Sequence, residues 1–368
     1  MLAFLSVALL VYGTMHFYAL SKVWLVFSHS LGLGLALALG GLVMTLSPLI
    51  IWFMEKQSWH GATVVAFWVT YIWMGFLFLF CSIALIYDLG HALATLMGFK
   101  WFLNETMAVL TVGLLALEML GYGLVEARQI QIEEIKITSS KLASGRVTIA
   151  QISDLHLGMM LGNEFIERIM TRLQEIQPDI VVATGDIVDG QGDDLDALAK
   201  QFHSLQSTKG AYAVIGNHEF YAGLENSLRF LRRAGFTVLR GESAVAAGIV
   251  FVGIDDSTAG TLGHEARVDT KKALSSVSKD NFIVLLKHQP VVDSETPFDL
   301  QLSGHIHGGQ IFPFGLLTRL VYGVRTGLTR LADGRWLYVS RGTGTWGPPI
   351  RIFAAPEITL ITVESENK

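Results

Sequence analysis

The sequence predicts an α/β protein in which a β-sandwich flanked by helices follows an all-α membrane region of four transmembrane helices. Apolar residues make up 51% of the 368-residue chain and charged residues only 16%, a balance too apolar for an ordinary soluble domain. Four apolar stretches fill the first third of the chain, and short strand-like segments alternate with helical ones in the remainder.

The charged side chains are concentrated in the second part of the chain. Residues 1–128 hold nine of the 59 Lys, Arg, Asp and Glu residues, and residues 129–368 hold the other 50. This split implies lipid first and water second, so we expect membrane helices in 1–128 and a separate domain in 129–368. The net charge of −5 offers no basic footprint, which argues against nucleic acid as a partner.

Each apolar stretch is long enough to cross a bilayer, which takes about 20 helical residues. The stretches cover residues 2–21, 31–53, 62–87 and 106–125. We expect the first to be retained, because it lacks the basic start and small-residue cleavage site of a signal peptide. Glu118 lies inside the fourth stretch. It is either a functional group, or a side chain bonded to a neighbouring helix or kept wet near the interface.

The basic residues near the spans favour a cytoplasmic second domain. With four spans, Lys56, Arg128 and Lys136 lie on the same side as that domain, and Lys22 and Lys100 lie opposite. The positive-inside rule assigns the richer side to the cytoplasm.

The second part of the chain alternates short β-branched segments with helical ones. We expect an edge strand within 129–145 and further strands at 147–152, 179–184, 211–215, 249–254, 282–286, 299–303, 336–340 and 358–363. Helices are expected at 165–176 and 195–205. This βαβαβ order predicts ligand-binding residues at the carboxyl ends of the strands.

Five short motifs follow one another along this region, most of them directly after a predicted strand. They are Asp154-Leu155-His156, Gly185-Asp186, Gly216-Asn217-His218-Glu219, Lys287-His288 and Gly304-His305-Ile306-His307. They supply oxygen and imidazole nitrogen but no thiolate, and the single cysteine, Cys81, lies in an apolar stretch. Such ligands suit a pair of divalent ions such as Mn²⁺, Fe²⁺ or Zn²⁺, and paired ions are typical of phosphoester hydrolysis.

The order and composition of these motifs resemble the calcineurin-like metallophosphoesterases. The resemblance covers about residues 147–364, with every motif present. With its N-terminal spans, the chain is most similar to the membrane-anchored bacterial branch. That branch includes phosphodiesterases and the UDP-2,3-diacylglucosamine pyrophosphatases of lipid A synthesis, so the resemblance implies a bacterial inner-membrane protein.

The resemblance also implies a role for each motif residue. One metal ion would be held by Asp154, His156 and His307, a second by Asn217, His288 and His305, and both by a bridging Asp186. We expect Mn²⁺, with Fe²⁺ or Zn²⁺ as alternatives. A water bridging the ions would attack phosphorus in line, and His218 would protonate the leaving oxygen. We interpret Asp189 and Glu219 as solvated turn residues, with Glu219 at most orienting its loop.

An unusual segment of apolar residues and arginines, 309–330, follows the last motif. Arg319, Arg325 and Arg330 are candidates for phosphate recognition, and the interleaved apolar residues suit contact with lipid. The alternative is an ordinary loop packed on the core, with its arginines in salt bridges. In the glycine-rich turn 342–351, Arg351 either holds a phosphate or forms an ion pair.

These observations favour a membrane-anchored, metal-dependent hydrolase of a phosphodiester or pyrophosphate bond in a lipid-linked substrate such as UDP-2,3-diacylglucosamine. Its partners would be the bilayer and that substrate. One alternative is a phosphodiesterase or phosphatase that acts on soluble nucleotides and uses the spans only as an anchor. Another is a non-catalytic membrane sensor that retains the metal fold, although the intact ligand set and His218 argue against it.

Overall fold

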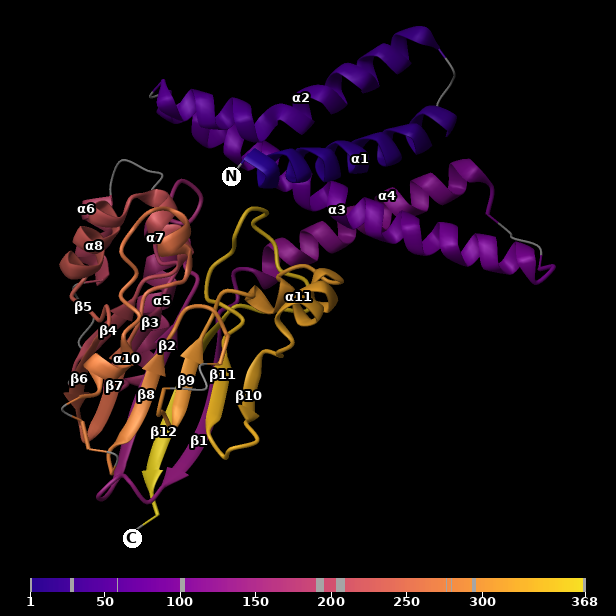
Figure 1. The fold of residues 1–368 in the computed structure, drawn as a ribbon. Helices are drawn as coiled ribbons and strands as arrows, with labels where there is room; N and C mark the ends of the chain where they lie inside the picture. The colour runs from indigo at the N-terminus through magenta and orange to yellow at the C-terminus, as the bar shows by residue number, and fades with distance from the viewer. Residues whose placement is uncertain are drawn as a thin grey trace. The chain divides into compact units, whose positions relative to one another are not determined.

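The structure, a computed structural model, describes residues 2–26, 30–57, 59–99, 103–189, 195–202, 209–275, 277–278, 280–292 and 296–366. Its contacts divide the chain into two units. The first comprises Met1–Val125 with Gly347–Ile350, and the second comprises Glu126–Trp346 with Arg351–Lys368. Figure 1 labels the helices and strands of both units.

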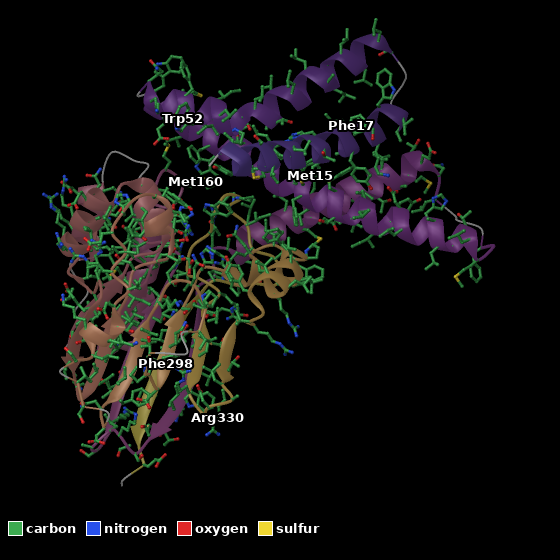
Figure 2. The ribbon with its side chains drawn as sticks, viewed as in Figure 1. Met15, Phe17, Trp52, Met160, Phe298 and Arg330 are labelled. Carbon is green, nitrogen blue, oxygen red and sulfur yellow. The ribbon has the colours of Figure 1, made fainter. Side chains whose placement is uncertain are left out.

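The first unit contains four helices that are long and apolar enough to cross a membrane, as predicted. They are α1 (Leu2–Val26), α2 (Leu31–Lys56), α3 (His60–Leu96) and α4 (Glu105–Glu126). Helices α1, α2 and α3 pack against one another. Large apolar side chains such as Phe17 and Trp52 project outward from α1 and α2 (Figure 2) and are 76% and 55% exposed, as expected of helices that face lipid tails.

Two polar residues of this unit depart from the sequence-based expectations. We expected the third span to end at residue 87, yet Asp88 lies within α3. Its carboxylate accepts hydrogen bonds from the Tyr18 hydroxyl at 2.6 Å and the Lys22 ammonium at 2.8 Å, and this pairing lowers the cost of a charge inside the helix bundle. Glu118 is exposed, so the expectation of a side chain turned toward a neighbouring helix is wrong.

The second unit is the predicted β-sandwich flanked by helices, built from two six-stranded mixed sheets. In spatial order, the first sheet contains β1 (Gln131–Ser139), β12 (Glu357–Ser365), β2 (Arg146–Ile152), β3 (Ile180–Thr184), β4 (Ala211–Val214) and β5 (Thr237–Val238). The second contains β10 (Gly327–Arg330), β11 (Trp336–Val339), β9 (Leu300–Ser303), β8 (Phe282–Leu286), β7 (Ile249–Gly253) and β6 (Glu242–Ala246). The predicted edge strand is confirmed as β1, whereas β5, β6 and β10 were not predicted.

Alternation along the strands gives each sheet two apolar faces. Ile149 of β2 and Phe251 of β7 belong to the core between the sheets, while the next residue, Ala150, belongs to a second core on the outer face of the first sheet. A strand exposes successive side chains to opposite faces, so fully apolar strands must be covered on both.

Helices complete the second unit. They are α5 (Asn163–Ile176), α6 (Leu195–Phe202), α7 (Asn217–Ala222), α8 (Leu224–Arg233), α9 (Thr258–Thr261), α10 (Thr270–Ala273), the short 3₁₀ helix η1 (His307–Gly309) and α11 (Phe314–Tyr322). Side chains of α5, α6 and α8 cover the outer face of the first sheet. The helix predicted at 195–205 corresponds to α6, and the end of that prediction lies outside the described residues.

Candidate metal centre

The five motifs meet because strands of both sheets end at the same edge of the sandwich. Strands β2, β3 and β4 are parallel neighbours in one sheet, as are β8 and β9 in the other. The Gln151 side chain of the first sheet donates to the Ser303 carbonyl of the second at 3.0 Å. Such bonds hold the two carboxyl edges together, and the predicted ligands follow them in the chain.

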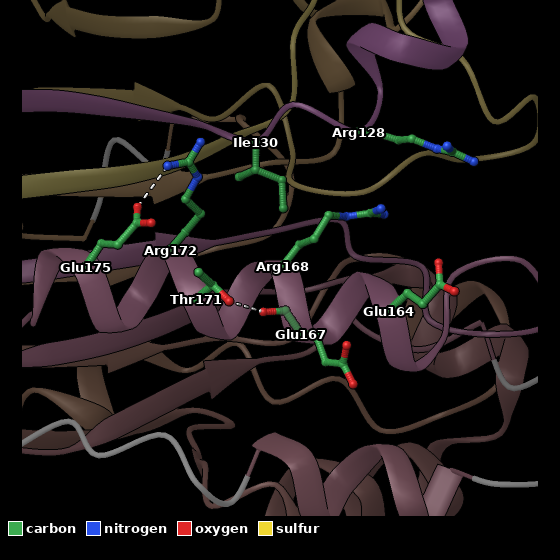
Figure 3. Close-up of a pocket in the computed structure, with 8 residues that line it drawn as sticks. All are labelled: Arg128, Ile130, Glu164, Glu167, Arg168, Thr171, Arg172 and Glu175. Atoms are coloured by element: carbon green, nitrogen blue, oxygen red, sulfur yellow. Dashed lines mark hydrogen bonds and ion pairs between the residues drawn. The ribbon is translucent and has the colours of Figure 1, made fainter.

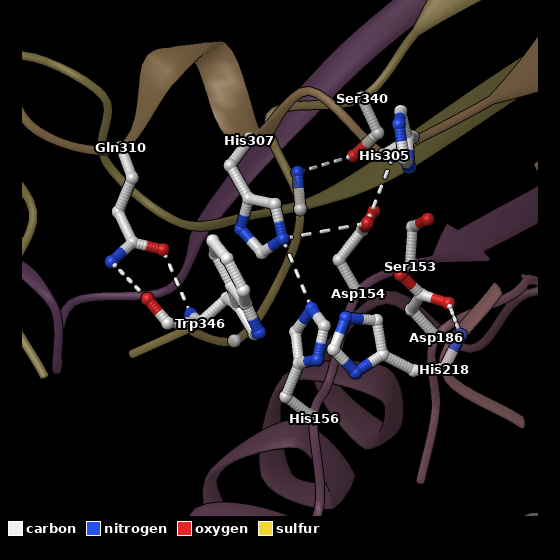
Figure 4. Close-up of polar contacts among 12 residues, drawn as sticks. Ser153, Asp154, His156, Asp186, His218, His305, His307, Gln310, Ser340 and Trp346 are labelled. Atoms are coloured by element: carbon white, nitrogen blue, oxygen red, sulfur yellow. Dashed lines mark hydrogen bonds and ion pairs between the residues drawn. The ribbon is translucent and has the colours of Figure 1, made fainter. Parts of the chain in front are cut away.

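The first group of ligands comprises Asp154, His156 and His307, which are all buried. Nε2 of His156 lies 3.0 Å from Nε2 of His307, which lies 3.5 Å from Oδ1 of Asp154. Figure 4 shows these three side chains together. Nδ1 of His156 faces Asp189 at 2.7 Å, which leaves the Nε2 lone pair for a metal ion.

The second group comprises Asp186, His288 and His305. Nε2 of His288 lies 3.0 Å from Oδ2 of Asp186 and 3.1 Å from Nδ1 of His305. Nδ1 of His288 lies 2.8 Å from the carbonyl oxygen of Thr184. A carbonyl only accepts, so this nitrogen carries the proton and Nε2 is the atom that can coordinate. Asn217 adjoins the group, because the next backbone N–H, of His218, donates to Oδ1 of Asp186 at 2.8 Å.

The backbone of the ligand residues is strained. Positive φ angles occur at Asp154 (54°), His156 (49°), Asp186 (54°), His305 (74°) and His307 (50°). Side chains other than glycine rarely adopt this region, and residues held in it cluster at functional sites. The strain turns each side chain sharply from the end of its strand toward the centre.

Burial and neighbouring charges set the protonation states of the ligands. Burial lowers the pKa of His305 to about 4 and, together with His156, lowers the pKa of His307 well below its usual range. Both rings are therefore neutral at pH 7, the form in which imidazole binds metals. Burial acts to raise the pKa of Asp186, but His288 and other nearby histidines outweigh it and hold that pKa well below its usual range. Asp186 is thus ionised, as a bridging ligand must be.

His218 and Asp189 form a hydrogen-bonded pair beside both groups. Nδ1 of His218 lies 2.9 Å from Oδ1 of Asp189, the oxygen that also faces His156. Burial acts to lower the pKa of His218, but the bond to Asp189 and the charges of Asp186 and Asp189 raise it to about 9. Our interpretation of Asp189 as a solvated turn residue is wrong, because its carboxylate orients two histidines of the site.

Glu219 is also no solvated turn residue, because its side chain is fully buried. Its carboxylate accepts four backbone N–H groups, from Asp186 at 3.0 Å, Ile187 at 2.6 Å, Val188 at 3.0 Å and Gly216 at 2.8 Å. Glu219 thereby joins the loop after β3 to the start of α7, and so holds Asp186 next to the residues that follow Gly216. Its expected role in orienting the loop is far more extensive than the sequence indicated.

The residues present fit a pair of divalent ions. Oδ1 of Asn217 and Oδ2 of Asp154 are buried and have no hydrogen-bond partner within the described ranges. A buried oxygen without a partner is costly, and a cation would satisfy both. Glycine leaves room for the carboxylates, because a Cβ atom at Gly216 or Gly304 would collide with Asp186 or Asp154.

Comparison with known proteins agrees with this geometry. Residues 147–309 match the family model for calcineurin-like phosphoesterases. A metallophosphoesterase of Aquifex aeolicus is 39% identical over 251 residues, which cover 67% of this chain and 96% of that protein. The chain belongs to the calcineurin-like phosphoesterase family. The predicted family, the sandwich fold and the class of metal-dependent phosphoester hydrolase are thereby confirmed.

Other members of the phosphoesterase family also carry membrane segments by name. A transmembrane protein with a metallophosphoesterase domain from Danio rerio is 32% identical over 280 residues, covering 72% of this chain and 63% of that protein. A relative from Campylobacter jejuni is 34% identical, and the chain covers 59% of its length. Among solved structures, a dimetal phosphatase from Danio rerio shares 15% identity over 53% of this chain and 87% of its own, with a TM-score of 0.35.

Tyr322 is a residue of this phosphoesterase site that sequence reasoning missed. Its hydroxyl, at the end of α11, lies 2.6 Å from Nε2 of His305. The opposite nitrogen of that ring, Nδ1, faces His288 and the rest of the second ligand group. Tyr322 therefore fixes the orientation of the His305 ring, although it has no motif of its own and lies in a segment that we assigned to substrate contact.

The arginines predicted to bind substrate occupy two different environments. Arg319, Arg325 and Arg330 are exposed on and after α11, and the guanidinium of Arg330 lies 5.4 Å from the ring centroid of Trp336. Arg351 is fully buried. Its guanidinium donates to backbone carbonyls, among them those of Gly344 at 2.6 Å and 2.9 Å and Ala354 at 2.7 Å. The structure therefore gives Arg351 a role in holding the loop around His307, and we no longer expect it to contact substrate.

A second concave region lies apart from the histidine-rich edge, on the outer side of α5. It encloses about 630 Å³ and is lined by Arg and Glu side chains of α5 together with Arg128 and Ile130 (Figure 3). The pair Arg172–Glu175 spans it at 2.8 Å. Its charges alternate in sign and it contains no histidine, so we assign it no part in phosphoester chemistry.

Proposed function

We propose that this chain hydrolyses a phosphodiester or pyrophosphate bond in a lipid-linked substrate such as UDP-2,3-diacylglucosamine. The observation that carries the chemistry is the position of His218, which lies beside both ligand groups and is held by Asp189 at 2.9 Å. A proton donor next to paired metal sites is what cleavage of a phosphorus–oxygen bond requires.

The seven predicted ligands would hold two ions in the arrangement that the motifs imply. Asp154, His156 and His307 would hold one, Asn217, His288 and His305 the other, and Asp186 would contact both. When bound, such ions neutralise phosphate charge and lower the pKa of water. We expect Mn²⁺ in this role, with Fe²⁺ or Zn²⁺ as alternatives.

The residues of the chain provide the proton for the leaving group. Nδ1 of His218 is engaged by Asp189, so Nε2 is the atom that can donate to the leaving oxygen. The raised pKa of His218, about 9, keeps the ring protonated at neutral pH. The bond from the His218 N–H to Asp186, at 2.8 Å, holds this donor in register with the metal ligands.

The lipid-linked substrate is supported by the membrane helices and by the segment around α11. Four helices of the same chain are long and apolar enough to cross a membrane, so lipid-linked molecules are locally concentrated. Leu316 and Leu320 of α11 are 59% and 82% exposed, and Arg319 and Arg325 near them suit phosphate groups. We place the second unit in the cytoplasm of a bacterium, on the distribution of basic residues around the spans.

A soluble nucleotide is the second candidate substrate, because aromatic rings flank His218. The ring of Tyr221 lies 5.4 Å from that of His218 and the ring of Trp346 lies 5.9 Å from it; Figure 4 shows Trp346 beside the histidines. Aromatic faces stack on nucleobases. They would serve the uridine of a nucleotide-lipid and a free nucleotide equally.

The test is release of UMP from UDP-2,3-diacylglucosamine by the full-length protein in detergent with added Mn²⁺. We expect release by the wild type and by His264→Ala, an exposed histidine outside the motifs, but none by His218→Ala. Turnover of soluble nucleotide esters without release of UMP would favour the second candidate. Loss of neither activity in His218→Ala would overturn the role of this residue.

A further inference from the structure

Helix α11 exposes the wrong face for a helix on a water-soluble surface. Leu316, Leu317, Leu320 and Val321 are 59%, 49%, 82% and 69% exposed. With 3.6 residues per turn, these four positions form one continuous stripe. None of the nine residues of α11 is buried, so the apolar stripe faces away from the sandwich.

The opposite face of α11 holds small and polar residues, and it contacts the metal motif. Gly315, Thr318 and Tyr322 lie on this face, at spacings of three and four residues. A Cβ atom at Gly309 would collide with the backbone of Gly315, so α11 begins in close contact with the loop that carries His307. At its other end, Tyr322 bonds His305 at 2.6 Å.

We propose that α11 is an interfacial helix whose Leu316–Val321 stripe inserts into the surface of a lipid bilayer. Interfacial helices combine an apolar face with basic residues at its border, and their apolar face enters the boundary between headgroups and acyl chains. The exposed Arg319 lies at the border of the stripe and Arg325 follows the helix, where both can contact anionic headgroups. This inference deepens the proposed function but rests on it only for the substrate.

Lipid fits this surface better than another protein does. A helix of nine residues is about 13 Å long, which is short for an interface that must bury about 1,200–2,000 Å². Four helices of the same chain are long and apolar enough to cross a membrane, so a bilayer is always at hand. Phe312 and Phe353, with ring centroids 5.9 Å apart and exposed fractions of 46% and 73%, widen the apolar surface at the start of the helix.

The location of α11 gives this contact a consequence for the metal centre. The helix touches the last metal motif at both of its ends, through Gly315 and through Tyr322. Lipid that holds α11 therefore also holds the ring of His305, and a lipid-linked substrate would reach the ligands along the helix without leaving the bilayer surface.

Fluorescence quenching tests the contact without any turnover. In a Cys81→Ser background, an environment-sensitive dye is attached at Leu320→Cys of the full-length protein in nanodiscs that contain phosphatidylglycerol and brominated phosphatidylcholine. The control is Val245→Cys on edge strand β6, which is apolar and 66% exposed. We expect blue-shifted, bromine-quenched emission at Leu320, at a depth of about 5–10 Å below the headgroups, and water-like emission at Val245.

The other outcomes of this experiment count against the proposal. Water-like emission at Leu320 would overturn it, and so would blue-shifted emission that bromine does not quench, because protein would then cover the helix. As a second measurement, Leu316→Asp/Leu320→Asp should lower turnover of a lipid-linked substrate by about tenfold and spare a soluble phosphodiester. If the proposed lipid substrate proves wrong, the quenching result still decides whether α11 enters the bilayer.

Discussion

Oδ1 of Asp189 lies 2.9 Å from Nδ1 of His218, so the proposed proton donor of this phosphoesterase is both oriented and charged by a residue outside the family motifs. The carboxylate and its neighbours raise the pKa of His218 to about 9. A histidine that donates a proton is active in its protonated form. Activity should therefore be constant below this pKa and fall as the pH rises through it.

Asp189→Asn should move the alkaline limb of the pH–rate profile to lower pH. The substitution removes a negative charge and a strong acceptor, so the pKa of His218 falls and the protonated form is lost earlier. We expect a decrease in kcat of about tenfold to a hundredfold with metal content retained. The control is Asp333→Asn, an exposed carboxylate paired with Arg335 at 2.6 Å. An alkaline limb that does not move in Asp189→Asn would refute the coupling between the two residues.

The sequence predicts the metal ligands well because they depend on local rules. Each follows the end of a strand that apolar, β-branched residues identify, and the order of parallel strands brings those ends together. Asp189 and Glu219 lack such a signal. Their roles arise from contacts with residues about 30 positions away, His156 and the loop around Asp186, so in sequence they look like ordinary turn residues.

Helix α11 and Asp88 could not be placed for a different reason. Apolar residues at helical spacing usually indicate a face turned to the core, whereas Leu320 of α11 points outward. A charged residue usually ends an apolar span, whereas Asp88 is paired with Lys22 at 2.8 Å and remains inside α3. In both cases the environment of the side chain, which the sequence does not state, reverses the usual rule.

Tyr322→Phe should weaken metal binding while leaving the fold intact. Removal of the hydroxyl 2.6 Å from Nε2 of His305 frees that ring to rotate, and loss of such an outer partner costs about 10–100-fold in metal affinity or activity. Binding of Mn²⁺ to the purified protein is measured by isothermal titration, with one of the two sites affected. Tyr212→Phe, inside the sandwich and stacked on Phe251 at 5.1 Å, is the control. Equal Mn²⁺ affinity at both sites in Tyr322→Phe and wild type would contradict the role.

Glu219→Gln should loosen the loop after β3. The amide of glutamine can accept with one oxygen only, while its NH₂ group faces backbone N–H groups that now bond a carboxylate. A buried N–H left without an acceptor costs about 1–3 kcal/mol. Hydrogen–deuterium exchange should therefore become roughly 5–150-fold faster at Asp186, Ile187 and Val188, at about tenfold per 1.4 kcal/mol.

The matched control for this substitution is Glu225→Gln, at an exposed position in the first turn of α8. It should leave exchange in the loop after β3 unchanged. Unaltered exchange in Glu219→Gln would mean that the four N–H groups are held by something other than this carboxylate.

Gly304→Ala should separate the geometry of the metal centre from the stability of the fold. A Cβ at this position would collide with the Ser153 hydroxyl and Oδ2 of Asp154, so Asp154 must move away from His156 and His307. We expect Mn²⁺ affinity to fall by about 10–100-fold and turnover to fall with it, whereas far-UV circular dichroism stays unchanged. Gly260→Ala in α9, where no atom lies within 4 Å of the new Cβ, should behave as wild type. Because both variants add the same methyl group, a loss confined to Gly304→Ala can only come from the displaced carboxylate, and full metal affinity in this variant would show that Asp154 is not a ligand.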